Sequence, residues 1–145
     1  MEKCLVIGAA GQIGTELVSA LRSKRGIDYV IAADLRVDNL SSPFYELDVT
    51  NESALLDLVV SEGVTEVYHL VAILSATGEK APKTAWELNM KTLLNVLDLA
   101  KEGIIQRVFW PSSIAVFGPS TPREKAPQYT VMDPNTVYGI SKSLG

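Results

Sequence analysis

A tyrosine and a lysine near the end of the sequence have the spacing of a proton-transfer pair. Tyr138 and Lys142 stand at positions i and i+4 of the stretch TVYGISKSLG, which would place both side chains on one face of a helix. A free phenol keeps its proton up to about pH 10, whereas a general base works best nearer neutrality. The ammonium of Lys142 would favour the phenolate form of the tyrosine. The pair therefore predicts a general base, although the same spacing is common on the surface of ordinary helices.

Two serines earlier in the sequence would supply hydroxyls to the same reaction. Ser112 and Ser113 follow Pro111 in FWPSSIAVFG, directly after an apolar run. Ligands of open parallel sheets bind at the carboxyl ends of the strands, so hydroxyls placed there would face a bound dinucleotide. A serine pair after a proline is also a common turn. With Tyr138 as the base, the pattern predicts oxidation of an alcohol that Ser113 holds by a hydrogen bond.

The glycine-rich turn VIGAAGQIG has the spacing used to bind the phosphates of a dinucleotide. Its glycines are Gly8, Gly11 and Gly14, between an apolar run and a helical pattern. The first permits a tight turn, the second a close approach of the backbone to a pyrophosphate, and the third close packing of helix on strand. The N–H groups of Gln12 and Ile13 would face the phosphate, aided by the helix dipole. The turn therefore predicts a dinucleotide-binding Rossmann fold.

Acidic residues after the second and third apolar runs would bind the adenosine half of the dinucleotide. Asp34 lies 20 residues after the last of these glycines, where a carboxylate accepts hydrogen bonds from ribose hydroxyls and repels a 2′-phosphate. NAD is therefore favoured over NADP. Leu35 and Arg36 would lie beside the ribose. The guanidinium of Arg36 could pair with a phosphate, so NADP stays an alternative. Asp48 and Val49 would bind the amino group of adenine and pack on its ring, unless Asp48 instead caps the following helix.

Five apolar runs of strand length alternate with three helical patterns. Four runs have the length of strands buried on both faces and cover residues 4–7, 29–33, 67–70 and 108–110, and a shorter strand candidate covers residues 44–47. Apolar residues recur on one face at helical spacing in 13–21, 55–59 and 86–100. Thr50 or Asn51 would cap the second helix, and Gly103 would end the third. This alternation predicts an α/β fold, a doubly wound parallel sheet in the order 3-2-1-4-5 with right-handed crossovers.

Composition and charge exclude several classes of function. The 145 residues are 47% hydrophobic and 21% charged, which is the balance of one folded domain. The net charge is −4 without a basic run, so we expect no nucleic-acid partner. We also expect no membrane span, because no apolar segment is long enough and no signal-peptide pattern opens the sequence. We expect no bound metal ion. The single cysteine, Cys4, fits a buried apolar position in a reducing compartment, which favours the cytoplasm.

As a set, these motifs resemble the extended branch of the short-chain dehydrogenase/reductase superfamily, the NAD-dependent epimerases and dehydratases, from Cys4 to the last residue. The shared pieces are GAAGQIG, Asp34, HLVAI, PSSIAVFG and YGISK. The stretches VIGAAGQIGTELV, LSATGEKAP, WPSSIAVFGPSTP and DPNTVYGISK are similar to the L-threonine 3-dehydrogenase group within that branch. The resemblance implies NAD-dependent oxidation of the threonine hydroxyl to 2-amino-3-oxobutanoate.

The resemblance also assigns roles to individual residues. It makes Tyr138 the general base, in contact with substrate and cofactor, and Lys142 its electrostatic partner and a ribose ligand. Ser113 would bind the reacting oxygen, with Ser112 beside it on the substrate or the nicotinamide. The residues expected to lie near the nicotinamide half of NAD are Leu70, Ala72, Ile73 and Asn89. Asn89 is equally well explained as an ordinary helix residue. Ser75 is a candidate substrate ligand, whereas His69 fits a core position without a catalytic role.

The family's substrate lobe and last strands are not found in these 145 residues. We therefore expect residues 1–145 to be an NAD-binding Rossmann domain that is incomplete on its C-terminal side. The substrate is expected to be a small molecule, with L-threonine favoured. The resemblance also implies a homodimer or other self-association through the long helix and the helix of Tyr138. Because the helix of Tyr138 is cut short, we expect apolar surface on Leu93, Leu97 and their neighbours to be exposed. Two alternatives stay open: the corresponding portion of a nucleotide-sugar epimerase or dehydratase, and a non-catalytic NAD-binding remnant.

Overall fold

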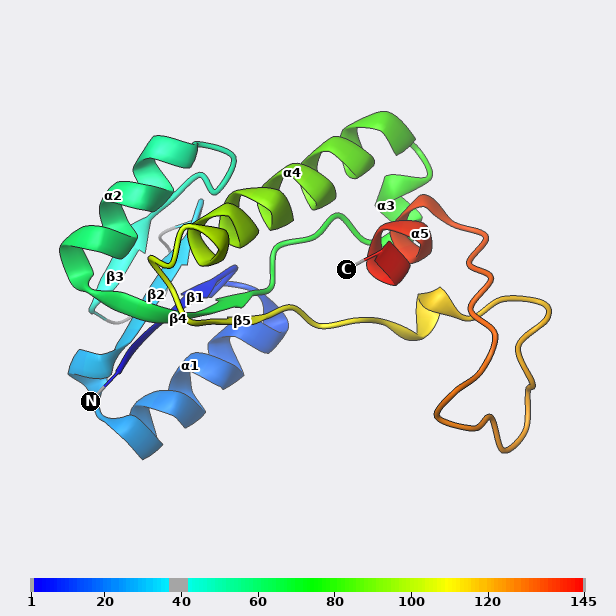
Figure 1. The fold of residues 1–145 in the computed structure, drawn as a ribbon, viewed down its shortest axis with the longest axis horizontal. Coiled ribbons are helices and arrows are strands. Elements are labelled where there is room, and N and C mark those ends of the chain that lie inside the picture. The colour runs from blue at the N-terminus through cyan, green and yellow to red at the C-terminus, as the bar shows by residue number, and fades with distance from the viewer. Residues whose placement is uncertain (1, 37–41, 145) are drawn as a thin grey trace. The chain divides into compact units, whose positions relative to one another are not determined.

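The computed structural model describes residues 2–36 and 42–144 (Figure 1). They form two compact units, one made of residues 1–71 and 92–110 and the other of residues 72–91 and 111–145. One of the passages between the units lies inside helix α4 (Pro82–Lys101), so each unit contains half of that helix.

The first unit is built on a five-stranded sheet of parallel strands. They follow the order β3-β2-β1-β4-β5, which confirms the predicted topology. The bounds are β1 (Lys3–Ile7), β2 (Val30–Asp34), β3 (Phe44–Glu46), β4 (Val64–His69) and β5 (Arg107–Phe109). The central strand β1 pairs with β2 and β4, and its last residue, Ile7, lies opposite Ala33 and His69. The glycine turn that follows Ile7 therefore begins between the carboxyl ends of two neighbouring strands.

Helices cover both faces of this sheet (Figure 1). On one face α1 (Gln12–Arg25) packs Val18 against a core cluster that includes Cys4, so the expected burial of that cysteine is confirmed. On the other face α2 (Glu52–Glu62) and the second half of α4 contribute Leu55 and Val96 to a larger cluster. A 3-10 helix (Ile27–Tyr29) leads into β2. Two apolar layers with one sheet between them are the doubly wound α/β fold that the sequence predicts.

Strand β4 begins three residues before its apolar pattern predicts, at Val64. The polar residues Thr65 and Glu66 interrupt that pattern, yet Glu66 is only 8% exposed. Its carboxylate accepts hydrogen bonds from Arg25 of α1 and from the hydroxyl of Tyr68. These partners offset the cost of burying a charge, and so a glutamate occupies an inner strand.

The ends of α2 and α4 carry the signals expected of them. Asn51 caps α2, because its side-chain oxygen accepts a hydrogen bond from the N–H of Ala54 (3.1 Å). The alternative that Asp48 caps this helix is wrong, since its Oδ1 accepts from the N–H and the hydroxyl of Thr50 (2.9 and 2.7 Å). Gly103 follows α4 with φ 74°, a conformation that favours glycine.

The second unit consists of short elements and a long loop. A one-turn helix that the sequence did not predict, α3 (Ser75–Gly78), precedes the first half of α4. The 3-10 helix η2 (Ile114–Val116) follows β5, and α5 (Val137–Leu144) ends the described part. Between η2 and α5 the chain makes a long excursion without helix or strand (Figure 1).

The exposed face of α4 differs from the predicted one. Leu97 is 41% exposed, as expected, and its neighbour Leu94 is 53% exposed, whereas Leu93, also expected to be exposed, is only 3% exposed because it packs into the interior. The predicted self-association through this helix stays a prediction. Within the described ranges, no helix is both long and apolar enough to cross a membrane.

Candidate active site

The glycine turn between β1 and α1 has the close backbone packing that the sequence predicts. Gly8 has φ 85°, and its N–H donates to the carbonyl of Ala33 (2.9 Å). A Cβ added at Gly14 would lie 2.2 Å from the carbonyl oxygen of Gly8. One added at Gly11 would lie 3.3 Å from the same oxygen. Side chains at these positions would fill the turn or push the helix away from the strand, so the cradle depends on glycine.

The N-terminus of α1 is free to bind an anion. Its N-cap is Gly11, and none of the described side chains caps this end of the helix. The first N–H groups of a helix have no partner within the helix, and the dipole makes that end positive. Gln12 and Ile13, which supply two of these groups, both have exposed side chains, with Ile13 65% exposed. The turn therefore fits the pyrophosphate of a dinucleotide, in line with its predicted role.

Asp34 lies directly beside this turn. Its Oδ2 accepts a hydrogen bond from the N–H of Ala10 (3.0 Å), and its Oδ1 accepts from the N–H of Arg36 (3.2 Å). A carboxylate has about four acceptor positions, so the two that stay available can receive ribose hydroxyls. The side chains of Leu35 and Arg36 are exposed. This placement is what the ribose role of Asp34 requires.

The predicted adenine contacts differ in how accessible they are. Asp48 is exposed, with one carboxylate oxygen held by Thr50. Val49 is 5% exposed in the larger core cluster, and its carbonyl accepts from the side chain of Asn95 (2.9 Å). The side chain of Val49 therefore belongs to the core and leaves little surface for an adenine ring. Leu70, after β4, is half-buried against the cluster that α1 covers.

Asn89 is used within the second unit as a clamp on the segment after β4. It is 1% exposed, and its side-chain amide accepts from the N–H of Ile73 (2.8 Å) and donates to the carbonyl of the same residue (3.2 Å). The amide nitrogen also lies 3.4 Å from the hydroxyl oxygen of Ser141 in α5. Ala72 is half-buried beside this clamp, and the side chain of Ser75 lies outside the described part of the structure. Asn89 thus holds backbone in place rather than leaving its amide open.

Helix α5 is fixed closely against the segment that carries the serines. A Cβ at Gly139 would lie 2.2 Å from the carbonyl oxygen of Ala115 in η2. The N–H of Val137 donates to Glu79 (2.7 Å), which anchors the start of the helix. The ammonium of Lys142 donates to the carbonyl of Pro111 (2.8 Å), two residues before Ser113. The structure therefore brings the lysine of the predicted pair to the serine segment.

Tyr138 and Lys142 share one face of α5, as their spacing predicts. The Nζ of Lys142 lies 5.9 Å from the centroid of the Tyr138 ring. Lys142 is 4% exposed, whereas Tyr138 is half-buried. Burial lowers the pKa of Lys142 from its ordinary 10.5 to about 8, because desolvation disfavours the ammonium. A lysine held in this state beside a tyrosine is a feature of functional sites.

Ser112 and Ser113 line a cavity of about 430 Å³. The hydroxyl oxygen of Ser113 accepts from the N–H of Ala115 (3.2 Å), which leaves its own proton to donate. The far side of the cavity is lined by residues 128–130 and Met132 of the long loop. Sequence reasoning missed these loop residues, since nothing in their pattern links them to a site.

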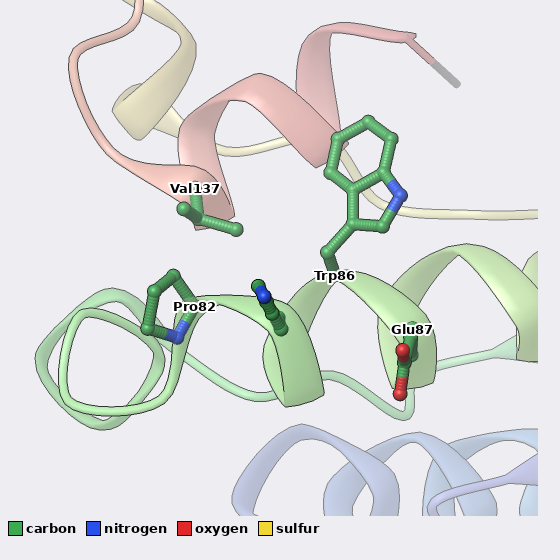
Figure 2. A pocket seen from close by; sticks show the side chains of 5 residues that line it. Pro82, Trp86, Glu87 and Val137 are labelled. Carbon is green, nitrogen blue, oxygen red and sulfur yellow. The ribbon is translucent and has the colours of Figure 1, made fainter.

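A second cavity, of about 300 Å³, lies between α4 and α5 in the same unit. Figure 2 shows Val137 directed toward Pro82 and Trp86, and Lys83 and Glu87 complete the lining. None of the predicted site residues lines it. Among the described residues, no group of three or more His, Cys, Asp or Glu side chains could hold a metal ion.

Comparisons with known proteins match nearly the whole chain to one family. The model of the NAD dependent epimerase/dehydratase family matches residues 4–145. An uncharacterized epimerase/dehydratase of Staphylococcus saprophyticus is 45% identical over 150 residues, which cover 100% of this chain and 47% of that protein. A homologous protein of Staphylococcus haemolyticus is 44% identical with the same coverage. The chain thus spans about half the length of the curated relatives it matches.

Solved structures of threonine dehydrogenases are similar to this chain. The GalE-like L-threonine dehydrogenase from Cupriavidus necator, in its holo form, has a TM-score of 0.92 and 52% identity, covering 96% of this chain and 46% of that one. The L-threonine dehydrogenase from Clostridium difficile has a TM-score of 0.93 and 42% identity, covering 100% and 47%. A UDP-glucose 4-epimerase has a TM-score of 0.88 at 23% identity over 99% and 45%, a likeness that concerns the fold alone.

Proposed function

Because the chain belongs to the NAD dependent epimerase/dehydratase family, we propose that it supplies the cofactor-binding and proton-transfer residues of an NAD-dependent L-threonine dehydrogenase. NAD is the cofactor of this family. The observation that carries the proposal is the contact of Lys142 with Pro111, since it joins the Tyr138 helix to the serine segment. The choice of threonine is supported by the solved dehydrogenase at 52% identity.

The residues of the first unit would hold the cofactor. The N–H groups at the start of α1 bind the pyrophosphate, and Asp34 accepts hydrogen bonds from the adenosine ribose. The free N-terminus of α1 and the closely packed glycines of the turn both fit this role. When bound, NAD accepts the hydride that leaves the carbon bearing the substrate hydroxyl.

The residues of the second unit would handle the proton. Ser113 donates a hydrogen bond to the substrate oxygen, because the bond that it accepts from the N–H of Ala115 leaves its hydroxyl proton available. Tyr138 takes the hydroxyl proton, and the positive charge of Lys142 stabilises the phenolate. The products are 2-amino-3-oxobutanoate, NADH and one proton. Ser112 lies beside Ser113 on the same cavity and would orient the rest of the substrate.

Formation of NADH with L-threonine tests the proposal. The unmodified chain, Tyr138→Phe and a matched Tyr45→Phe variant outside the site are compared at equal concentration. We expect Tyr138→Phe to lower the rate at least about 100-fold and Tyr45→Phe to leave it unchanged. Equal rates in the unmodified chain and Tyr138→Phe would exclude Tyr138 as the base. NAD binding by calorimetry without any NADH would instead favour the non-catalytic remnant.

A thermal-shift comparison distinguishes a threonine dehydrogenase from the remaining alternative, a nucleotide-sugar epimerase or dehydratase. The midpoint of unfolding is measured with NAD plus L-threonine and with NAD plus a UDP-sugar. Greater stabilisation by threonine supports the proposal, because a ligand that binds the native state raises its stability. Greater stabilisation by the UDP-sugar would assign the chain to a nucleotide-sugar epimerase or dehydratase.

A further inference from the structure

The cavity beside Ser113 is formed by two segments that are distant in the sequence. Ser112, Ser113 and the apolar side chains of η2 form one part of its lining. Gln128, Thr130 and Met132 belong to the excursion between η2 and α5 that Figure 1 shows. A loop that lines a cavity together with a candidate catalytic serine is in a position to contact the substrate.

The lining of this cavity is uncharged and largely apolar, with a few hydroxyl and amide groups. The lining residues are Ser112, Ser113, Ile114, Val116, Phe117, Gln128, Tyr129, Thr130 and Met132, without a lysine, arginine, aspartate or glutamate. Nucleoside diphosphates are usually bound through cationic side chains or a helix N-terminus. Hydroxyl and amide groups instead suit a small zwitterion, since the Gln128 amide can both donate to a carboxylate and accept from an ammonium. The cavity therefore favours a small hydroxy amino acid.

The base of the loop is fastened by a hydrogen-bonded clamp. The hydroxyl of Thr121, which is 8% exposed, donates to the carbonyl of Val131 (2.6 Å) and accepts from the N–H of Gly118 (3.1 Å). The Oδ2 of Asp133 accepts from the N–H of Ser120 (2.9 Å). These hydrogen bonds lower the pKa of Asp133 and so favour its carboxylate. Both ends of the loop are thus joined, which fixes the position of the residues between them.

The clamp acts at the point where the loop meets the cavity. Val131, whose carbonyl is held, is 54% exposed and does not line the cavity. Its two neighbours, Thr130 and Met132, do line it. The clamp therefore presents these two side chains to the cavity by holding the backbone between them.

We propose that residues 128–132 form a substrate-binding wall, in which Gln128 and Thr130 bind the ammonium and carboxylate of a small 3-hydroxy amino acid and Met132 contacts its apolar end. Thr121 is a positioning residue for this wall. The inference rests on the proposed function, because it takes the substrate hydroxyl to lie at Ser113.

Methionine methyl signals give a direct test. The chain contains three methionines, Met1, Met90 and Met132, so carbon-13 labelling of their methyl groups yields few signals. L-threonine is titrated into the labelled chain with NAD present, and UDP-glucose is titrated separately. We expect L-threonine to shift the Met132 signal in a saturable way while the Met90 signal stays in place. UDP-glucose should leave Met132 unmoved.

Variants identify the polar contacts. We expect Thr130→Val and Gln128→Leu each to weaken the apparent affinity for L-threonine by about tenfold, the usual effect of losing a hydrogen bond to a charged group. Thr84→Val makes the same exchange at an exposed position of α4 outside the cavity and should leave the affinity unchanged. Thr121→Val should weaken binding, and Thr121→Ser, which keeps the hydroxyl, should restore it at an unchanged melting temperature.

Three results would overturn the inference. The first is a Met132 signal that L-threonine does not move, and the second is unchanged affinity in both Thr130→Val and Gln128→Leu. The third is an equal shift by UDP-glucose, which would contradict the small-substrate class. NADH formation with an unmoved Met132 signal would reject the wall and keep the proposed function. A saturable Met132 shift with equal NADH rates in Tyr138→Phe would keep the wall and reject Tyr138 as the base.

Discussion

The burial of Lys142 predicts a pH-dependent cost in stability. Its side chain is 4% exposed, and desolvation lowers its pKa from the ordinary 10.5 to about 8. The folded chain therefore binds this proton less strongly than the unfolded chain does. Below about pH 8 the lysine is charged in both states and the folded state bears the full cost of the buried ammonium. As the pH rises from about 8 to about 10.5, folding stability should increase.

The size of this effect follows from the pKa difference. The interval between 10.5 and about 8, at about 1.4 kcal/mol per pH unit, corresponds to about 3 kcal/mol of free energy of unfolding. The hydrogen bond from Lys142 to Pro111 contributes about 1 kcal/mol in the opposite direction. A Lys142→Met variant lacks both contributions. It should be about 2 kcal/mol more stable than the unmodified chain at pH 7 and slightly less stable at pH 10.5.

Urea denaturation of both proteins between pH 6.5 and pH 10.5 measures this difference. Both proteins carry Tyr138→Phe, so that the phenol beside Lys142 does not contribute, and the other titrating groups cancel in the difference curve. Lys91→Met, at an exposed position of α4, controls for the change in net charge. A Lys142→Met difference that stays constant across the pH range would refute the reasoning. It would show that the ammonium is not desolvated in the folded chain.

Three further substitutions separate the cofactor site from the structural framework. Gly14→Ala places a Cβ 2.2 Å from the carbonyl oxygen of Gly8. Urea denaturation should show that the free energy of unfolding falls by about 1–3 kcal/mol, and calorimetry should show a weaker affinity for NAD. Glu66→Gln removes the charged partner of Arg25 and should cost about 2 kcal/mol at pH 7. Burial alone would raise the pKa of Glu66, but hydrogen bonds from Arg25 and Tyr68 lower it below the ordinary 4.5. The difference in stability between Glu66→Gln and the unmodified chain should therefore shrink as the pH falls below about 4. Asn51→Ala should lower the free energy of unfolding by about 1 kcal/mol in the same assay, since it removes the cap of α2. The affinity for NAD should stay unchanged, and an altered affinity would contradict the separation of cofactor site and framework.

The framework of the first unit could be predicted because its signals are local. Apolar runs locate strands, and the glycine turn locates the junction of β1 with α1, so the strand order followed from general rules of α/β folds. The start of β4 could not be located this way. Glu66 looks like a loop residue in the sequence, and only its pairing with Arg25 from another element makes it a strand residue. The exposed Leu94 and Leu97 show a similar limit, since periodicity identifies an apolar stripe without showing what covers it.

The side chains of the candidate site could be predicted by type, but their partners could not. The spacing of Tyr138 and Lys142 follows from helix geometry, whereas the contact of Lys142 with Pro111 joins residues that are 31 positions apart. The clamp of Asn89 on Ile73 and the loop residues beside Ser113 depend in the same way on tertiary packing. No periodic pattern encodes such contacts, because each is set by how separate segments fold back on one another.

The position of Tyr138 and Lys142, the proposed proton-transfer pair, is determined within the second unit. Gly139 permits α5 to approach Ala115, and Ser141 meets the amide of Asn89 on the adjoining turn. Lys142 then reaches Pro111 from the same face. These contacts hold α5 at three points, and each uses a small or polar residue where alanine or leucine would stabilise an isolated helix better. A helix selected for stability alone would not bury a lysine, so we infer that α5 keeps Lys142 for the chemistry of Tyr138.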